Sequence, residues 1–150
     1  MVKVYVASSW RNEYYNRVVS DLSRAGHKVW DWRMPPTGGT GFGWQQTGLD
    51  GYKHGDKVDV KTWVRMLEHP VAQAGYASDL AGMNWCDVGV LLHPCGRSAH
   101  FEAGWLSGRG KKVHLLVPEP VEPDLMILAA NGKICDSIDR LIFTLSGEQE

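Results

Sequence analysis

The chain opens with an alternation of short apolar runs and helically spaced apolar positions. Residues 2–7 form an apolar, β-branched run that predicts a buried strand ending at a polar turn. Apolar positions within residues 12–25 then recur at helical spacing, and Gly26 stands where a helix C-cap residue is expected. Residues 27–32 predict a second strand. This β-α-β beginning favours a parallel sheet with a right-handed crossover.

Between residues 34 and 56 the apolar pattern gives way to prolines, glycines and polar side chains. Loops longer than roughly 12 to 15 residues without regular structure are uncommon in compact domains, and they often serve as lids or binding loops. We therefore expect residues 34–56 to form an active-site loop. A mobile insertion without function is the alternative.

The rest of the chain continues to alternate strands and helices. Two helices are predicted over residues 57–68 and 71–85, separated at His69-Pro70 because proline disfavours helix in the residue before it. The later segments predict, in order, a strand at 87–93, a helix at 98–107, a strand at 112–117, a helix around 122–130, a strand at 133–135 and an amphipathic helix at 136–145.

This alternation predicts one α/β domain over residues 1–150. We expect a doubly wound, Rossmann- or flavodoxin-like sheet of about five mainly parallel strands with helices on both faces. In such sheets ligands bind beyond the carboxyl ends of the strands, so the residues that follow each strand are the first candidates for a site.

Composition restricts the class of partner more than the fold. The 16 basic and 17 acidic residues create no broad field to hold nucleic acid or an anionic membrane. No apolar run approaches the roughly 20 residues that cross a bilayer, and Met1 leads directly into a strand rather than a signal peptide, so we expect a cytoplasmic protein with a small-molecule partner. The three cysteines, Cys86, Cys95 and Cys135, lack paired metal-ligand spacing and are expected to be reduced thiols.

Polar groups concentrate where the strands end. The first strand is followed by Ser8, Ser9, Trp10 and Arg11. The most apolar strand is followed by Gly96-Arg97-Ser98, so Ser98 can cap the next helix and backbone N–H groups there can receive an anion or a hydroxyl. Glu102 follows Ser98 by four positions on the same helix face, near the positive end of the helix dipole. Glu102 is therefore a candidate ligand-contacting carboxylate; a surface residue that only compensates the dipole is the alternative.

Asp79 is the second carboxylate of interest. It lies on a helix that runs into the central strand, beside the apolar positions Tyr76, Leu80 and Met83. Partial burial would raise its pKa and suit it to proton donation, whereas a solvated or capping aspartate would have no such role. Two carboxylates in one pocket fit a two-step glycosyl transfer, in which one attacks the anomeric carbon and the other protonates the leaving group.

At these residues the sequence resembles the nucleoside 2-deoxyribosyltransferase family and its relatives, the 2′-deoxynucleoside 5′-monophosphate N-hydrolases. The similar segments are residues 4–11, Asp79-Leu80 with residues 86–90, and residues 101–105 with residues 110–113. The resemblance implies cleavage of the N-glycosidic bond of a (deoxy)nucleoside or nucleotide through a covalent glycosyl-glutamate intermediate. Transfer to another base or to water would follow, without a metal or other cofactor.

The resemblance also implies roles for individual residues. Glu102 takes the place of the nucleophile, and Asp79 that of an acidic group contacting the base. The segment at Asp124 resembles one that reaches a neighbouring subunit's site, which implies a homo-oligomer. The expected substrate-binding residues are Ser8, Ser9, Trp10, Arg11, Gln45, Arg97, Ser98, His100 and Asp124.

The sequence leaves the substrate's 5′ group and the reaction class open. Arg97 and His100, together with Ser9 and Arg11, can receive a phosphate, whereas the Asp124 carboxylate would repel one. A nucleoside 5′-monophosphate N-glycosidase is therefore one alternative. A hydrolase of NAD-like nucleotides is another, because interleukin-receptor-like (TIR) domains also place a glutamate in a small parallel α/β fold. A non-catalytic nucleotide sensor that keeps the pocket without turnover is the third.

Overall fold

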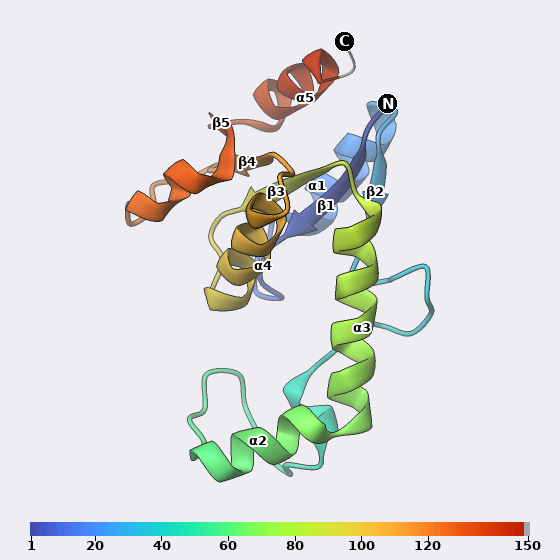
Figure 1. The fold of residues 1–150 in the computed structure, drawn as a ribbon, viewed down its shortest axis with the longest axis vertical. Coiled ribbons are helices and arrows are strands. Elements are labelled where there is room, and N and C mark those ends of the chain that lie inside the picture. The colour runs from blue at the N-terminus through green and yellow to red at the C-terminus, as the bar shows by residue number, and fades with distance from the viewer. Residues whose placement is uncertain (149–150) are drawn as a thin grey trace. The chain divides into compact units, whose positions relative to one another are not determined.

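The computed structural model describes residues 1–148, which separate into two compact units. The larger unit comprises Met1–Asp31 and the chain from Met83 onward, and the smaller unit is Trp32–Gly82. The elements of the larger unit are β1 (Lys3–Ala7), α1 (Tyr15–Arg24), β2 (Lys28–Trp30), β3 (Val88–Leu92), α4 (Arg97–Gly108), β4 (Val113–Leu116), η2 (Leu125–Ala130), β5 (Asn131–Cys135) and α5 (Ile138–Gly147) (Figure 1). Those of the smaller unit are η1 (Trp44–Thr47), α2 (Val60–Glu68) and most of α3 (Pro70–Trp85).

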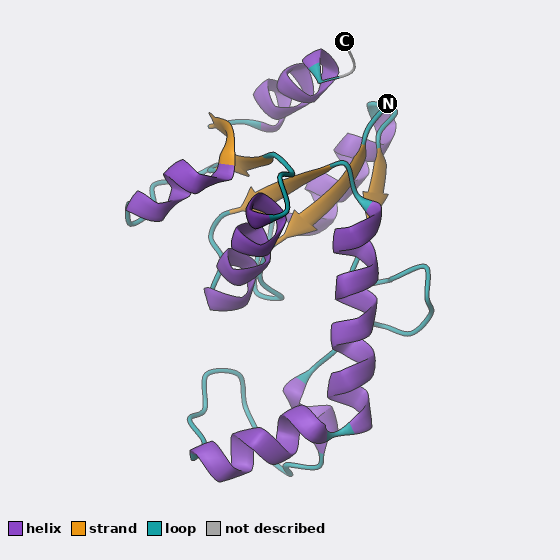
Figure 2. Cartoon of the chain, viewed as in Figure 1, coloured by secondary structure: helices purple, strands orange, loops and turns teal. Residues whose placement is uncertain are grey.

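A five-stranded, all-parallel sheet forms the centre of the larger unit (Figure 2). Its strand order is β2-β1-β3-β4-β5, so the chain moves outward from β1 in one direction and from β3 in the other. All five residues of β3 are buried, as expected of a central strand covered on both faces. The predicted α/β class with about five parallel strands is confirmed.

Helices cover both faces of this sheet (Figure 1). Helix α4 packs on β3, β1 and β4, whereas α1 and α5 contact each other on the opposite face. Gly89 permits the close approach of α4, because a Cβ there would lie 2.7 Å from Leu106 Cδ1. The core side chains are the aliphatic and aromatic residues that the strand and helix patterns predict, including Val4, Tyr15 and Leu141.

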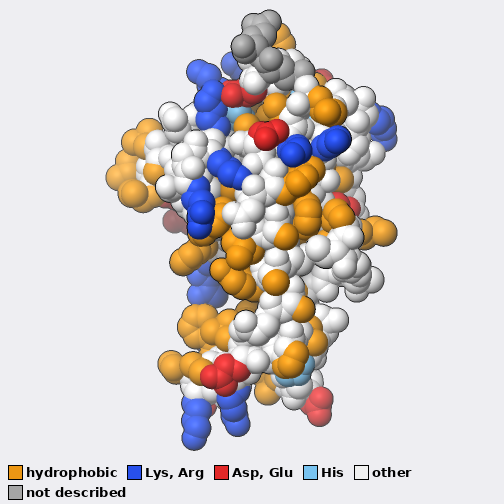
Figure 3. Space-filling model, turned by 45° about the vertical axis from the view of Figure 1, so that its right-hand side comes forward, with side chains coloured by type: hydrophobic (Ala, Val, Ile, Leu, Met, Phe, Trp, Pro, Cys, Tyr) orange, Lys and Arg blue, Asp and Glu red, His pale blue; other side chains and the backbone are white. Residues whose placement is uncertain are grey.

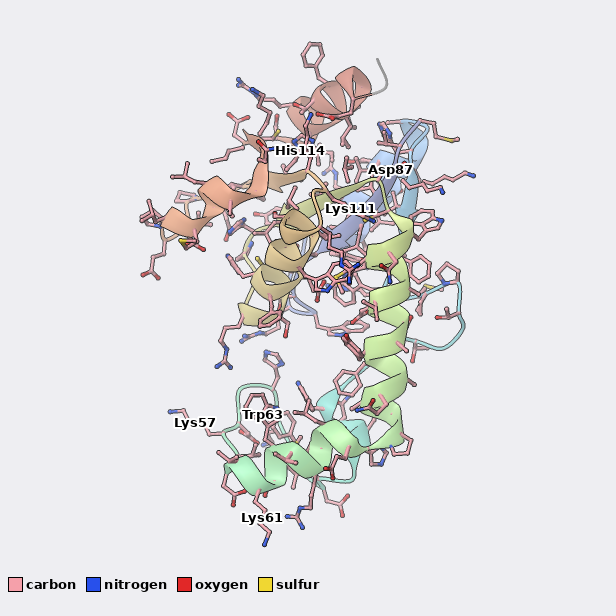
Figure 4. The ribbon with its side chains drawn as sticks, in the orientation of Figure 1. Lys57, Lys61, Trp63, Asp87, Lys111 and His114 are labelled. Carbon is pink, nitrogen blue, oxygen red and sulfur yellow. The ribbon has the colours of Figure 1, made fainter. Side chains whose placement is uncertain are left out.

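Two side chains fix the turn between α3 and β3 (Figure 4). The Lys111 ammonium donates to the carbonyl oxygens of Met83, Asn84 and Cys86, at 2.7, 2.9 and 2.6 Å. Asp87 Oδ2 accepts a hydrogen bond of 2.9 Å from the Lys3 backbone N–H. The central strand thus enters the sheet from an anchored helix end.

Most predicted helices and strands are present, and many of them are shorter than predicted by one to three residues at an end. Helix α1 is followed by Gly26 at φ 90°, the left-handed conformation that its predicted place after a helix requires. The break at His69-Pro70 is also present. The helix predicted around 122–130 is wrong in type and start: it is a 3-10 helix beginning at Leu125, because the Asp124 side chain caps it by accepting from the Met126 N–H.

The smaller unit holds the predicted active-site loop and two helices. The loop is mostly irregular, with the single 3-10 turn η1 inside it, where Trp44 packs edge-on against Phe42 at a centroid distance of 4.9 Å. Helix α2 starts at Val60 because Asp59 accepts from the Thr62 N–H at 2.7 Å. None of the helices among the described residues combines the length and apolar character needed to cross a bilayer.

Candidate functional site

A pocket of about 520 Å³ lies beyond the carboxyl ends of β3 and β4 in the larger unit. Three short segments form it: the residues after β3, one position in α4, and the chain after β4. Its lining residues are His93, Pro94, Cys95, His100, Pro120, Val121, Glu122, Pro123, Asp124 and Leu125. The volume is within the range of small-molecule sites, and its place in the sheet is where ligands bind in this fold class.

The loop after β1 is bonded to the chain that forms this pocket. Ser8 Oγ donates to the Leu92 carbonyl at 2.9 Å, and Asn12 Nδ2 donates to the Pro94 carbonyl at 3.0 Å. The predicted residues Ser9, Trp10 and Arg11 follow Ser8 in this loop. Asn12, which is almost fully buried, was absent from the predicted site although it holds the loop against Pro94. Its side chain also accepts from the Tyr14 N–H, a local turn-forming bond that an asparagine before a helix can signal.

The start of α4 differs from the prediction. Gly96, not Ser98, is the N-cap residue, with extended backbone at φ −102° and ψ −160°. Ser98 lies inside the first turn and is exposed, as is Arg97. Glu102 is the sixth residue of α4, and the first turn holds no acidic residue. The prediction that Glu102 lies near the positive end of the helix dipole is therefore wrong, because the effect of the dipole falls off within the first turn.

His100 connects the start of α4 to the chain after β4. Its Nδ1 lies 2.8 Å from the Gly96 carbonyl oxygen, and its Nε2 lies 3.7 Å from Asp124 Oδ2. The His93 ring stands nearly perpendicular to that of His100, with 5.5 Å between centroids. Burial lowers the pKa of His93, and the charge of His100 lowers it further. The predicted residues His100 and Asp124 are thus brought together in one pocket wall.

Cys95 links the pocket to Glu102. Burial raises the pKa of the Cys95 thiol to about 12, and the negative charge of Glu102 contributes to this increase. The Glu102 side chain is partly buried in the middle of α4. The charge of Glu102, the predicted nucleophile, therefore affects the pKa of Cys95 in the pocket wall.

Asp79 and Gln45 belong to the smaller unit. Burial raises the pKa of Asp79 to about 6, in the direction that the sequence predicted. The apolar stripe predicted beside it is wrong at Tyr76, which is 61% exposed, whereas Leu80 is partly buried and Met83 is buried. Gln45 is an exposed residue of η1.

Known proteins share this fold. A 2-deoxyribosyltransferase from Bacillus psychrosaccharolyticus aligns over 93% of this chain and 90% of its own, with a TM-score of 0.57 and 20% identity. A conserved protein from Enterococcus faecalis V583 aligns over 99% of both chains, with a TM-score of 0.60 and 12% identity. A CMP N-glycosidase from Clostridium botulinum aligns over 96% of this chain and 98% of its own, with a TM-score of 0.51 and 16% identity.

These similarities confirm the fold that the sequence resemblance implied. No protein-family model matches the sequence, and the search of curated proteins found no match. At identities of 12 to 20%, the structural similarity establishes the arrangement of strands and helices and leaves the activity to be argued from the site.

Proposed function

We propose that the protein cleaves the N-glycosidic bond of a nucleoside and transfers the sugar to another base or to water. One observation carries the proposal: a small-molecule pocket lies at the carboxyl ends of β3 and β4, and its wall includes Cys95, whose pKa the charge of Glu102 raises, in a fold shared with a 2-deoxyribosyltransferase and a CMP N-glycosidase. The fold alone does not determine the reaction, so the chemistry is argued from the side chains.

Glu102 is the nucleophile in this mechanism. Its carboxylate attacks C1′ of the sugar as the bond from C1′ to the base nitrogen breaks, which gives a glycosyl ester on Glu102. The sequence resemblance assigns the proton donor to Asp79: the leaving base takes the electron pair of the broken bond and a proton from this residue. A second base or a water molecule then attacks C1′, loses a proton to Asp79 and releases the Glu102 carboxylate. The pKa of about 6 at Asp79 supports this role, because a group that titrates near neutrality can both donate and accept a proton.

The charges around the pocket favour a free nucleoside as the substrate. The described residues that line it include the carboxylates Glu122 and Asp124 and no lysine or arginine. A carboxylate accepts a hydrogen bond from a 5′-hydroxyl but repels a 5′-phosphate. The monophosphate remains the second candidate, because His93 and His100 also line the pocket and one structural neighbour is a CMP N-glycosidase.

The direct test is product analysis by liquid chromatography. The protein would be incubated with deoxynucleosides, ribonucleosides and their 5′-monophosphates, each with and without a second free base, and with NAD. We expect base release from a free nucleoside and formation of a new nucleoside when an acceptor base is present. Turnover of monophosphates alone would move the assignment to the N-glycosidase. Nicotinamide release would indicate the NAD-hydrolase alternative, and tight binding without product a sensor.

Substitution of Glu102 tests the covalent step. Glu102→Ala should reduce turnover by at least roughly 10³-fold, because removal of a nucleophile that forms the intermediate removes the pathway. Glu68→Ala, at the exposed end of α2, is the matched control and should keep full activity. Intact-mass spectrometry of acid-quenched protein should detect a sugar adduct on the wild type and none on Glu102→Ala. Full activity of Glu102→Ala would contradict the proposed role.

A further inference from the structure

Three potential metal ligands meet in the pocket wall: His93, Cys95 and His100. One ring nitrogen of each histidine and Cys95 Sγ all lie within 4.8 Å of one another. Zinc bonds of about 2.0 to 2.3 Å to nitrogen and sulfur need ligand atoms roughly 3.3 to 4 Å apart. Small side-chain rotations would therefore close the cluster around one ion. The spacing of the cysteines alone does not reveal this cluster, because its other two ligands are histidines two positions before and five positions after Cys95.

His93 supplies an independent observation. The residue is only 8% exposed, and its Nδ1 is buried without a hydrogen-bond partner among the described residues. Buried polar atoms are nearly always paired, because burial without a partner costs about 1 to 3 kcal/mol. The glycosidic mechanism proposed above uses neither His93 nor Cys95. A bound ion would give this ring a function that no neighbouring side chain provides.

The two ring nitrogens of His100 face different residues, Cys95 and Asp124. Its Nδ1 lies 3.9 Å from Cys95 Sγ, which is long for a hydrogen bond, and its Nε2 faces Asp124 Oδ2 at 3.7 Å. If Nδ1 binds a metal, the ring proton moves to Nε2, where the Asp124 carboxylate can accept it. Histidine ligands usually donate their other ring N–H to a carboxylate, a backbone carbonyl or water. The Gly96 carbonyl that Nδ1 would release still accepts from the His100 backbone N–H at 3.3 Å.

From this geometry we propose that His93, Cys95 and His100 form a binding site for Zn²⁺, with Asp124 orienting His100 and the fourth position open to the pocket. A thiolate with two imidazoles selects a borderline-soft ion such as zinc over Mg²⁺ or Ca²⁺, which prefer oxygen ligands. On binding, the Cys95 thiol releases its proton to solvent and its sulfur donates an electron pair to the ion. The site shares the pocket wall with the proposed substrate site, but zinc binding can be measured without any glycosyl transfer.

The test is titration of the full chain, free of any affinity tag, with Zn²⁺ in competition with a chromophoric chelator. We expect one ion per chain. Cys95→Ser and His100→Gln should each weaken binding by more than the roughly 10- to 100-fold that loss of an outer partner typically costs. Asp124→Asn should fall within that 10- to 100-fold range. Cys135→Ser, at a buried cysteine of β5 outside the cluster, is the matched control and should bind as the wild type does.

Cobalt substitution reports on the ligands themselves. Co²⁺ should give a thiolate-to-metal charge-transfer band in the near ultraviolet and the visible bands of a tetrahedral ion. Both should disappear in Cys95→Ser and persist in Cys135→Ser. Circular dichroism of each variant separates loss of ligand from loss of fold, and His100→Gln provides a second test at a partly exposed position. Zinc affinity unchanged in both Cys95→Ser and His100→Gln, or no binding by the folded wild type, would overturn the proposal.

Discussion

At the scale of single residues, Asp79 makes the stability of the protein depend on pH between acidic and neutral values. Burial raises its pKa from 3.8 to about 6. A tenfold change in proton affinity is worth about 1.4 kcal/mol, so keeping the charged form in the folded protein costs up to about 3 kcal/mol. Strongly shifted pKa values are common at functional positions, which is consistent with the proposed role of Asp79.

The sign of the effect on stability follows from the pKa values. The folded protein binds the Asp79 proton more tightly than the unfolded chain does, so the associated stabilisation is complete below pH 3.8 and is lost as pH rises past about 6. We expect Asp79→Asn to become more stable relative to wild type across this interval, by up to about 3 kcal/mol at neutral pH. Urea unfolding from pH 4 to 8 measures it, with the exposed Asp136→Asn as control. A difference that does not vary with pH would contradict the assignment.

The surroundings of the candidate residues were only partly predictable from the sequence. The raised pKa of Asp79 followed from its place beside apolar positions, yet the neighbouring Tyr76 is exposed. Ser98 was expected to cap α4 because serine is a favoured cap residue, but the backbone becomes helical one residue after Gly96. The residue at which α4 begins depends on the path of the backbone after β3. The helix or cap preferences of single residues do not specify that path.

At the scale of elements, Lys111 holds the end of α3 in place. Its ammonium donates to three carbonyls from residues 25 to 28 positions earlier in the sequence. The last turn of a helix leaves carbonyl groups without partners, and a cation there also interacts favourably with the helix dipole. Lys111 therefore satisfies several acceptors at once, just before the chain enters the central strand.

Removal of this cation should be costly. We expect Lys111→Met to reduce the free energy of unfolding by about 2 to 3 kcal/mol, because three carbonyls lose a charged donor. The adjacent Lys112, whose side chain is 46% exposed and pairs with Glu148, provides the control: Lys112→Met should cost less than about 1 kcal/mol. Denaturant titration of both variants decides between them. Equal losses would show that the three short contacts of Lys111 contribute no more than a surface ion pair.

The break between α2 and α3 was predictable because proline marks it. The starts of α2 and α5 were missed by two to three residues: Asp59 and Ser137 cap these helices, whereas the predicted helices began at residues 57 and 136. The helix η2 also follows a capping residue, Asp124, which the predicted start at residue 122 missed, and its 3-10 type was not predicted. The Lys111 contacts were beyond prediction because they join segments far apart in sequence.

At the scale of the whole molecule, the exposed apolar surface of the larger unit calls for an explanation. Helix α4 contacts η2, and these neighbouring elements expose Phe101, Leu125 and Leu128 by 82, 78 and 81%. Figure 3 shows hydrophobic side chains open to solvent at several places on one face. Large exposed apolar side chains gathered on adjacent elements are typical of interfaces. The sequence resemblance implied a homo-oligomer through the segment at Asp124, which directly precedes η2.

We therefore predict that the chain associates with itself through α4 and η2. Sedimentation equilibrium should give a mass that is a multiple of 16.7 kDa, and Leu128→Lys should shift it towards 16.7 kDa because a charge would be buried at the interface. Phe143→Lys, at an equally exposed position on α5, is the control and should leave the mass unchanged. If both variants dissociate the oligomer, the interface includes α5 as well as η2. A wild type of 16.7 kDa at all concentrations would contradict the predicted self-association.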